Sequence, residues 1–298
     1  MKELVVISGK GGTGKTSVVA SFAALARRAV VADCDVDAAD LHLLLAPRDL
    51  RCEDFSGGAR AAVDPGRCVA CGRCRELCRF DAIGQDGPRN AAGERTYRVD
   101  PVACEGCGVC AEFCPAQAIT LKPVVNGQWF IAESRYGPMV HAALRPGEEN
   151  SGKLVSIVRT QARKVAEQNG LDLILVDGSP GIGCPVIASI TGADLTLAVA
   201  EPSLSGLHDL VRVADLAGHF GIPMLVCINK WDINAELTER IEATAAERDI
   251  PLAGRVRYDP AVTAAQIQGR TVVEFTQAGA AEDISRLWQR VASELAHG

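Results

Sequence analysis

The feature that most constrains the fold is a glycine-rich segment at residues 8–17, Ser-Gly-Lys-Gly-Gly-Thr-Gly-Lys-Thr-Ser. Apolar runs at residues 4–7 and 18–25 flank it, so the pattern predicts a strand, a loop and a helix in succession. Residues 9–16 match G-x-x-x-x-G-K-[ST], in which backbone N–H groups surround phosphate oxygens, the lysine neutralises charge and the hydroxyl ligates Mg²⁺. The predicted nucleotide-binding residues of this segment are Gly9, Lys10, Gly11, Gly12, Thr13, Gly14, Lys15, Thr16 and Ser17.

Lys10 makes this loop resemble the deviant Walker A loop of the MinD, ParA and nitrogenase iron protein group of P-loop ATPases. In that group the first lysine reaches the nucleotide of a partner subunit. The resemblance therefore implies ATP or ADP with Mg²⁺, an ATP-dependent homodimer, and catalytic roles for Lys10 and Lys15. The alternative is that Lys10 is only a solvated loop lysine.

Acidic residues follow the next apolar run, residues 29–33, where ligands bind in open α/β sheets. In the resembling group an aspartate of this first switch orients the attacking water. Asp35 matches that position best and Asp33 is second. Asp37 and Asp40 are better explained as caps of a following helix.

A further apolar run at residues 173–177 ends in Asp177 and is followed by glycine-rich residues at 178–183. This pair of segments resembles a Walker B strand and a second switch, which implies that Asp177 binds Mg²⁺ through water, together with Thr16. Cys184 follows the switch, and we expect a small buried residue there in preference to a metal ligand.

The segment Asn229-Lys230-Trp231-Asp232 matches the N-K-x-D guanine signature of GTPases. In MinD-like ATPases, however, the asparagine meets adenine, and the loop around Lys10 favours ATP. Tyr258, Asp259 and Pro260 also resemble the adenine-side loop of those ATPases. Ser205 is expected to cap a helix that ends near residue 220.

A cysteine pattern, C-x2-C-x2-C-x3-C, occurs twice with a 36-residue offset. It resembles the bacterial two-cluster ferredoxin, in which three cysteines of one copy bind a [4Fe–4S] cluster with the fourth cysteine of the other copy. A zinc site is the alternative, but a third nearby cysteine and the duplication favour clusters. Arg79 stands in the first copy where Pro115 stands in the second. The predicted ligand sets are Cys68, Cys71, Cys74 and Cys114 for one cluster and Cys104, Cys107, Cys110 and Cys78 for the other.

These patterns predict an α/β fold: a mostly parallel-sheet P-loop domain at residues 1–54 and 123–298, interrupted by a small ferredoxin-like α+β module at 55–122. The net charge of −6 gives no basic field for nucleic acid. No apolar run approaches the roughly 20 residues of a membrane span, and a C-terminal helix with few arginines is expected to pack on the sheet. We expect a cytoplasmic protein with no stable membrane insertion.

Together the motifs resemble MinD-superfamily P-loop ATPases with an inserted ferredoxin domain. The resemblance implies a Mg²⁺-dependent ATPase that couples the nucleotide state of a homodimer to electron transfer, through two [4Fe–4S] clusters, to a redox or metallocofactor protein. One alternative is an ATP-dependent factor that assembles a metal or iron–sulfur cofactor. Another is a positioning ATPase of the MinD or ParA type.

Overall fold

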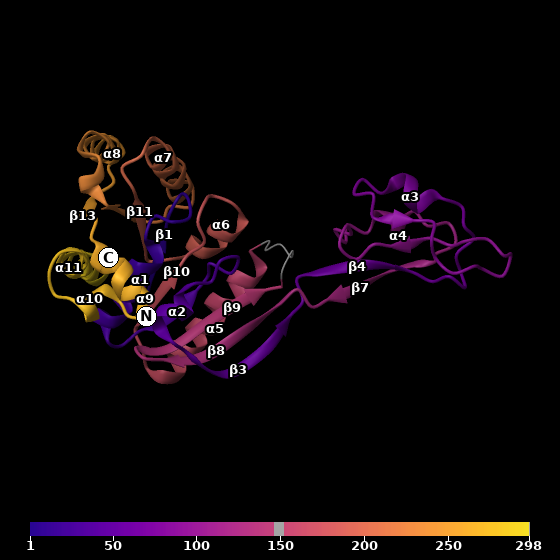
Figure 1. Ribbon diagram of the computed structural model, residues 1–298, viewed down its shortest axis with the longest axis horizontal. Helices are drawn as coiled ribbons and strands as arrows, with labels where there is room; N and C mark the ends of the chain where they lie inside the picture. The colour runs from indigo at the N-terminus through magenta and orange to yellow at the C-terminus, as the bar shows by residue number, and fades with distance from the viewer. Residues whose placement is uncertain (146–151, 298) are drawn as a thin grey trace. The chain divides into compact units, whose positions relative to one another are not determined.

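The computed structural model describes residues 1–145 and 152–297 (Figure 1). These residues divide into two compact units. The first unit contains residues 1–53, 128–144 and the described residues from 152 onward, and the second contains residues 54–127 with Arg145. The module predicted at residues 55–122 lies within the second unit.

A nine-stranded sheet, in the order β13-β12-β11-β1-β10-β2-β9-β8-β3, forms the centre of the described part of the first unit. Every neighbouring pair from β13 to β9 is parallel, which confirms the predicted fold class. Strands buried on both faces read as continuous apolar runs, as residues 4–7 do. The strands are β1 (Lys2–Ile7), β2 (Val30–Asp33), β3 (Arg48–Phe55), β8 (Gly127–Ser134), β9 (Gly137–Leu144), β10 (Leu173–Asp177), β11 (Leu195–Ala200), β12 (Met224–Asn229) and β13 (Leu252–Val256).

Helices follow most strands of this sheet, as the βαβ pattern of a parallel sheet requires. Helix α1 directly follows the glycine-rich loop, and α6 directly follows the predicted second switch. The helical elements of this unit are α1 (Lys15–Ala26), α2 (Leu41–Leu45), α5 (Lys153–Asn169), α6 (Cys184–Ile190), α7 (Leu204–His219), η1 (Trp231–Ile233), α8 (Ala235–Glu247), α9 (Pro260–Ile267), α10 (Val272–Phe275) and α11 (Ala280–His297).

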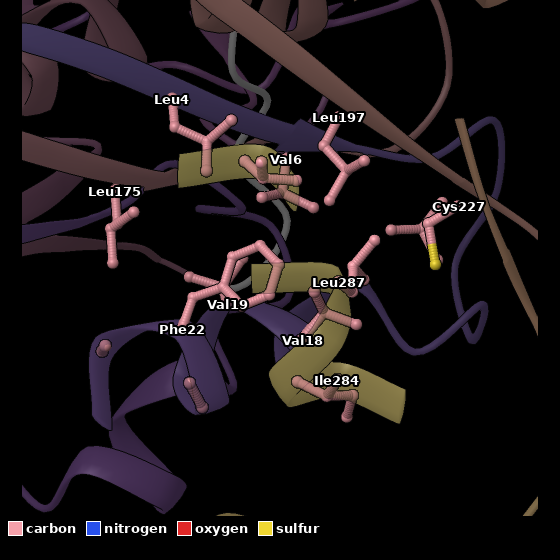
Figure 2. Packing of buried hydrophobic residues seen from close by; sticks show 14 of the residues in the cluster. Leu4, Val6, Val18, Val19, Phe22, Leu175, Leu197, Cys227, Ile284 and Leu287 are labelled. Carbon is pink, nitrogen blue, oxygen red and sulfur yellow. The ribbon is translucent and has the colours of Figure 1, made fainter. Parts of the chain in front are cut away.

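The main core lies between the sheet and helices α1 and α11. Figure 2 shows side chains of β1, α1 and α11 converging there, among them Val6, Phe22 and Leu287. The rings of Phe22 and Trp288 are 5.0 Å apart, and burying one such side chain contributes about 1.5–3 kcal/mol. The C-terminal helix α11 therefore packs on the body of the unit, as expected. No helix within residues 1–145 or 152–297 is long and apolar enough to cross a membrane.

The second unit has its own small core, which includes Tyr97, Ile119 and the buried cysteines Cys74 and Cys110. Two antiparallel pairs frame it: β4 (Gly58–Val63) with β7 (Ile119–Val124), and β5 (Ile83–Gly84) with β6 (Arg98–Val99). Two short helices, α3 (Arg73–Leu77) and α4 (Val109–Glu112), pack against each other. Each copy of the cysteine repeat therefore supplies one short helix to a shared core.

Candidate nucleotide-binding site and cysteine cavities

The glycine-rich loop adopts a conformation that its glycines make accessible. Gly12 and Gly14 have φ angles of 80° and 92°, which L side chains rarely adopt. A Cβ atom at Gly14 would lie 2.3 Å from Nδ2 of Asn229. That same Nδ2 donates a hydrogen bond to the Thr13 carbonyl at 2.7 Å. The end of β12 thus fixes the loop between β1 and α1.

A cleft of about 460 Å³ opens over this loop. The predicted residues Lys15, Thr16 and Ser17 line it together with Asp35 and Gln266. The Gln266 amide donates to the Ser17 hydroxyl at 2.8 Å, which connects α9 to the first turn of α1. The cleft lies at the carboxyl ends of parallel strands, where ligands bind in open α/β sheets.

Lys15 is buried between two carboxylates at the base of the cleft. Its Nζ lies 2.5 Å from Oδ1 of Asp177 and 3.3 Å from Oδ2 of Asp35. Burial by itself lowers the pKa of Lys15, but the negative charges of Asp177 and Asp35 outweigh burial and raise that pKa. The structure therefore brings together three side chains that the sequence analysis placed in one site.

Two carboxylate oxygens in this group lack partners. Oδ2 of Asp33 and Oδ2 of Asp177 are buried and accept no hydrogen bond from any described residue. Burial, followed by the charge of Asp177, raises the pKa of Asp33, while burial outweighs the opposing charge of Lys15 and raises the pKa of Asp35. Carboxylate oxygens without hydrogen-bond partners are the hard ligands that Mg²⁺ prefers, so Asp177 fits that ion.

The Lys10 side chain contacts residues of its own chain. Its ammonium forms an ion pair with Glu201 and donates to the Ser205 hydroxyl at 2.9 Å. Burial raises the pKa of Glu201, but the hydrogen bond and charge of Lys10 outweigh burial and lower it. Glu201 is thus ionised at neutral pH, and Lys10 is engaged within the chain.

Ser205 was expected to cap helix α7, and this expectation is wrong. Ser203 is the N-cap, and its hydroxyl accepts a hydrogen bond from the Gly206 amide at 3.0 Å. A serine pair two residues apart offers two cap candidates, and only the backbone conformation selects one. The hydroxyl of Ser205 contacts Lys10 instead.

A second cleft, of about 220 Å³, adjoins the loop on the side of β12 and β13. Asn229, Tyr258 and Asp259 line it, and Pro260 begins the adjacent helix α9. Asp259 caps α9 by accepting from the Ala261 amide at 2.8 Å. These predicted base-contact residues therefore lie around one cleft that is contiguous with the glycine-rich loop.

The aspartate of the N-K-x-D segment already has a backbone partner. Oδ1 of Asp232 accepts a hydrogen bond from the Tyr258 amide at 2.7 Å. Lys230 directs its ammonium to the Gly12 carbonyl at 3.3 Å. Two members of this segment thus stabilise the loops around the second cleft.

The eight repeat cysteines surround two cavities in the second unit. One cavity is bounded by four cysteines, and the other by the remaining four. Each set combines three cysteines of one repeat with the last cysteine of the other. The sets are Cys68, Cys71, Cys74 and Cys114 for the first cavity and Cys104, Cys107, Cys110 and Cys78 for the second.

The two cavities have matching exposure. Cys74 and Cys110 are buried, whereas Cys71 and Cys107 are exposed. No three His, Cys, Asp or Glu side chains in residues 1–145 and 152–297 lie close enough together to hold a single metal ion. Each cavity is instead lined by four thiols that come from both repeats.

The remaining cysteines lie outside these cavities. Cys34 and Cys227 are buried, and Cys52 is exposed. Cys184 is also exposed, at the start of α6, so the expectation that it is a small buried residue is wrong. The second switch carries it at a helix start, where apolar neighbours do not enclose it.

Sequence reasoning missed Glu201, Ser203 and Gln266 as neighbours of the loop. Glu201 and Ser203 are about 190 residues from Lys10, and Gln266 is 249 residues from Ser17. The glycine-rich segment gives no local signal for such partners. A polar cluster at the end of the β11 strand was the only sequence feature that could have suggested two of them.

Residues 4–272 match the family of CobQ/CobB/MinD/ParA nucleotide binding domains. The chain belongs to this family. Among relatives of this MinD/ParA-family protein, the uncharacterized protein MJ0578 of Methanocaldococcus jannaschii is 32% identical over 236 residues, or 78% of this chain and 79% of that protein.

Solved structures share the fold of this family member. Pyrococcus furiosus cell division ATPase MinD has a TM-score of 0.56 and 17% identity, covering 98% of this chain and 99% of that one. The septum site-determining protein MinD of Pyrococcus horikoshii, complexed with Mg-ADP, has a TM-score of 0.57 and 17% identity, covering 97% and 95%. At such identities the similarity concerns the fold alone.

Proposed function

We propose that this protein binds ATP with Mg²⁺ and hydrolyses it as a homodimer. The observation that carries the proposal is Lys15, held between Asp177 and Asp35 at the end of the glycine-rich loop. Lys15 binds phosphate oxygens, and Asp35 orients the attacking water. Thr16 and Asp177 hold Mg²⁺, which when bound neutralises charge on the phosphoryl oxygens.

In this proposal Lys10 acts across the dimer. It leaves Glu201 and Ser205 and reaches the nucleotide of the partner subunit, where its positive charge stabilises the transition state. Replacing Lys10 with alanine should therefore reduce hydrolysis more than nucleotide binding, whereas replacing the exposed Lys164 should change neither. Unchanged ATP turnover in Lys10→Ala would overturn the dimer proposal.

The second cleft binds adenine in preference to guanine. Guanine recognition by N-K-x-D needs the aspartate to face the base, whereas Asp232 is not among the residues that line this cleft and its Oδ1 accepts from the Tyr258 amide. Asn229 and Tyr258 contact the base, with Asp259 and Pro260 shaping its edge. Competition between ATP and GTP for the protein tests this assignment, and equal affinity for both would contradict it.

We further propose that the second unit carries two [4Fe–4S] clusters and passes electrons to a redox or metallocofactor protein. The supporting observation is that each cavity is bounded by four cysteines drawn from both repeats. The clusters supply one-electron transfer when bound. The cysteines hold them, the apolar lining excludes water, and Cys71 and Cys107 bring each site to the surface.

Anaerobic reconstitution with EPR, with and without ATP, tests this function. We expect about eight iron atoms per chain from two four-iron clusters, and a change with ATP in the midpoint potentials or in the reduction rate of a partner. Cys71→Ser should disturb one cluster and spare the other, while Cys52→Ser, at an exposed cysteine outside both cavities, should spare both. No change with ATP would overturn the coupling.

A positioning ATPase is the second candidate function, favoured by the fold shared with cell division ATPase MinD. It predicts ATP-dependent binding to anionic vesicles or to DNA, measured by co-sedimentation. Cofactor assembly predicts ATP-dependent transfer of labelled iron from this protein to an apo-acceptor. Electron transfer predicts neither result.

A further inference from the structure

The two halves of the second unit share one backbone design. Gly72 and Gly108 stand in equivalent positions of the repeat, with φ, ψ angles of 84°, −14° and 80°, −10°. Each precedes a short helix, α3 or α4, that carries a buried cysteine. Because the backbones match, the fold does not explain a difference in side chains between equivalent positions.

The side chains of the two halves differ sharply in charge. Residues 65–79 contain four arginines and one glutamate, whereas the equivalent residues 101–115 contain two glutamates and no basic residue. The equivalents of Arg67, Arg73 and Arg75 are small or apolar: they are Ala103, Val109 and Ala111. The cavity and its cysteines do not need arginine at these positions, because the second half provides the same arrangement without it.

The arginines of the first half are available to a partner. Arg67, Arg73, Arg75 and Arg79 are all exposed. Within the described residues, the ion pair they form is the one between Arg73 and Glu76, at 3.6 Å and with both side chains more than half exposed. Such a pair contributes little, so the positive charge is not neutralised within the chain.

An apolar centre accompanies this charge. Val69 lines the first cavity beside the exposed Cys71 and is itself 56% exposed. Its equivalent in the second half is Glu105, which lies beside the exposed Cys107. Val69 thus stands within the same 15-residue segment as the four exposed arginines. An exposed apolar residue among like charges is the composition of a transient, electrostatically steered interface.

We infer that the arginine-bearing half, residues 65–79, is the docking surface for an acidic one-electron carrier protein, and that Glu105 keeps such a carrier away from the other half. This inference rests on the proposed electron-transfer function. With an oxidised cluster held by Cys68, Cys71, Cys74 and Cys114, one electron would pass from the reduced carrier to the chain, so the carrier would be oxidised by one electron and the chain reduced by one. No bond forms or breaks.

The test replaces the arginines with the residues of the second half, in the triple variant Arg67→Ala, Arg73→Val, Arg75→Ala. Binding of the reconstituted full chain to a plant-type [2Fe–2S] ferredoxin, which is acidic, is measured by titration at low and high salt. We expect the triple variant to bind about 10-fold more weakly at low salt, with the difference lost near 0.5 M salt, because exposed charges are screened. A variant with lysine at the three positions should retain binding.

Glu105→Val is the matched control, because it places in the second half the residue found in the first. It should bind the ferredoxin at least as tightly as the natural chain does. Equal binding by the natural chain and the triple variant, no binding by the natural chain at low salt, or preferential binding of a basic cytochrome c to the arginines would each overturn the docking surface. Iron and sulfide content report separately on the proposed function, since full clusters with charge-independent binding would sink only the docking surface.

Discussion

At the scale of single residues, Gly14 has the strictest requirement. Its φ of 92° and the 2.3 Å approach of Asn229 Nδ2 to a Cβ atom leave no room for a side chain. We expect Gly14→Ala to cost about 1–2 kcal/mol in backbone strain and to weaken ATP binding at least 10-fold by displacing Asn229. Gly218→Ala, on α7 and outside the loop, is the control, because its Cβ would meet no atom within 4 Å. Isothermal titration with ATP compares the two, and equal affinities would contradict the assignment.

If Lys10 acts across a dimer, its ion pair with Glu201 should weaken ATP-dependent dimerisation. The ion pair holds Lys10 in its own subunit, so Glu201→Gln should strengthen ATP-dependent dimerisation by about 2–5-fold, as expected for a partly exposed pair of up to 1 kcal/mol. Sedimentation velocity with and without ATP measures this change. Lys10→Ala is a control with the opposite expected effect and should abolish ATP-dependent dimerisation. Weaker dimerisation in Glu201→Gln would show that Glu201 supports the dimer.

At the scale of elements, the sequence predicts what depends on periodicity and motif. The order of strand, loop and helix around Gly9–Thr16 follows from an apolar run on each side of the glycines. The buried position of Arg159 on the apolar face of α5 does not follow from such a pattern. Arg159 pairs with Glu3 at 2.6 Å and donates to the Ala188 and Thr191 carbonyls near the end of α6. Its partners are brought close only by the completed sheet.

The loop after β13 is tied to α11 by one ion pair. Asp283 accepts hydrogen bonds from the Arg257 side chain at 2.7 Å and from its backbone amide at 3.0 Å. Burial raises the pKa of Asp283, but these bonds outweigh burial and lower it. The stabilisation is thus complete above the unfolded value of about 3.9 and is lost as pH falls through the lower folded value.

Asp283→Asn removes this charge-dependent contribution. We expect the melting temperature at pH 7 to fall by roughly 2–4 °C, and the loss of stability below pH 4 to become shallower than in the natural chain. Thermal melts from pH 7 to pH 3 measure both effects. Asp215→Asn, at an exposed ion pair with Arg248, is the control and should change little. Parallel acid profiles for the natural chain and Asp283→Asn would contradict the assignment.

At the scale of the whole molecule, the two units differ in how much of their candidate sites the sequence predicts. The cysteine repeat predicts which thiols line the same cavity, because its spacing repeats in both halves and each half supplies one short helix. The placement of Lys10 against Glu201 brings together side chains that are far apart in the sequence of the first unit, and no residue spacing predicts it. Local motifs therefore identify the chemistry of a site, and long-range packing determines how the charged side chains of that site are arranged.

The two units have separate cores, so removal of the second should spare the first. Its ends lie close together: the Asn126 amide donates to the Phe55 carbonyl at 2.8 Å, and its side-chain oxygen accepts from Gly57. We therefore expect a chain in which residues 57–125 are replaced by a short glycine loop to fold and to bind ATP within about 3-fold of the natural affinity, since the residues that line both clefts belong to the first unit. It should bind no iron after reconstitution.

Circular dichroism, ATP titration and iron analysis test the three expectations, with Cys71→Ser as a control that keeps both units. Iron retained by the shortened chain would place a cluster in the first unit, and loss of ATP binding in a folded chain would show that the nucleotide site depends on the second.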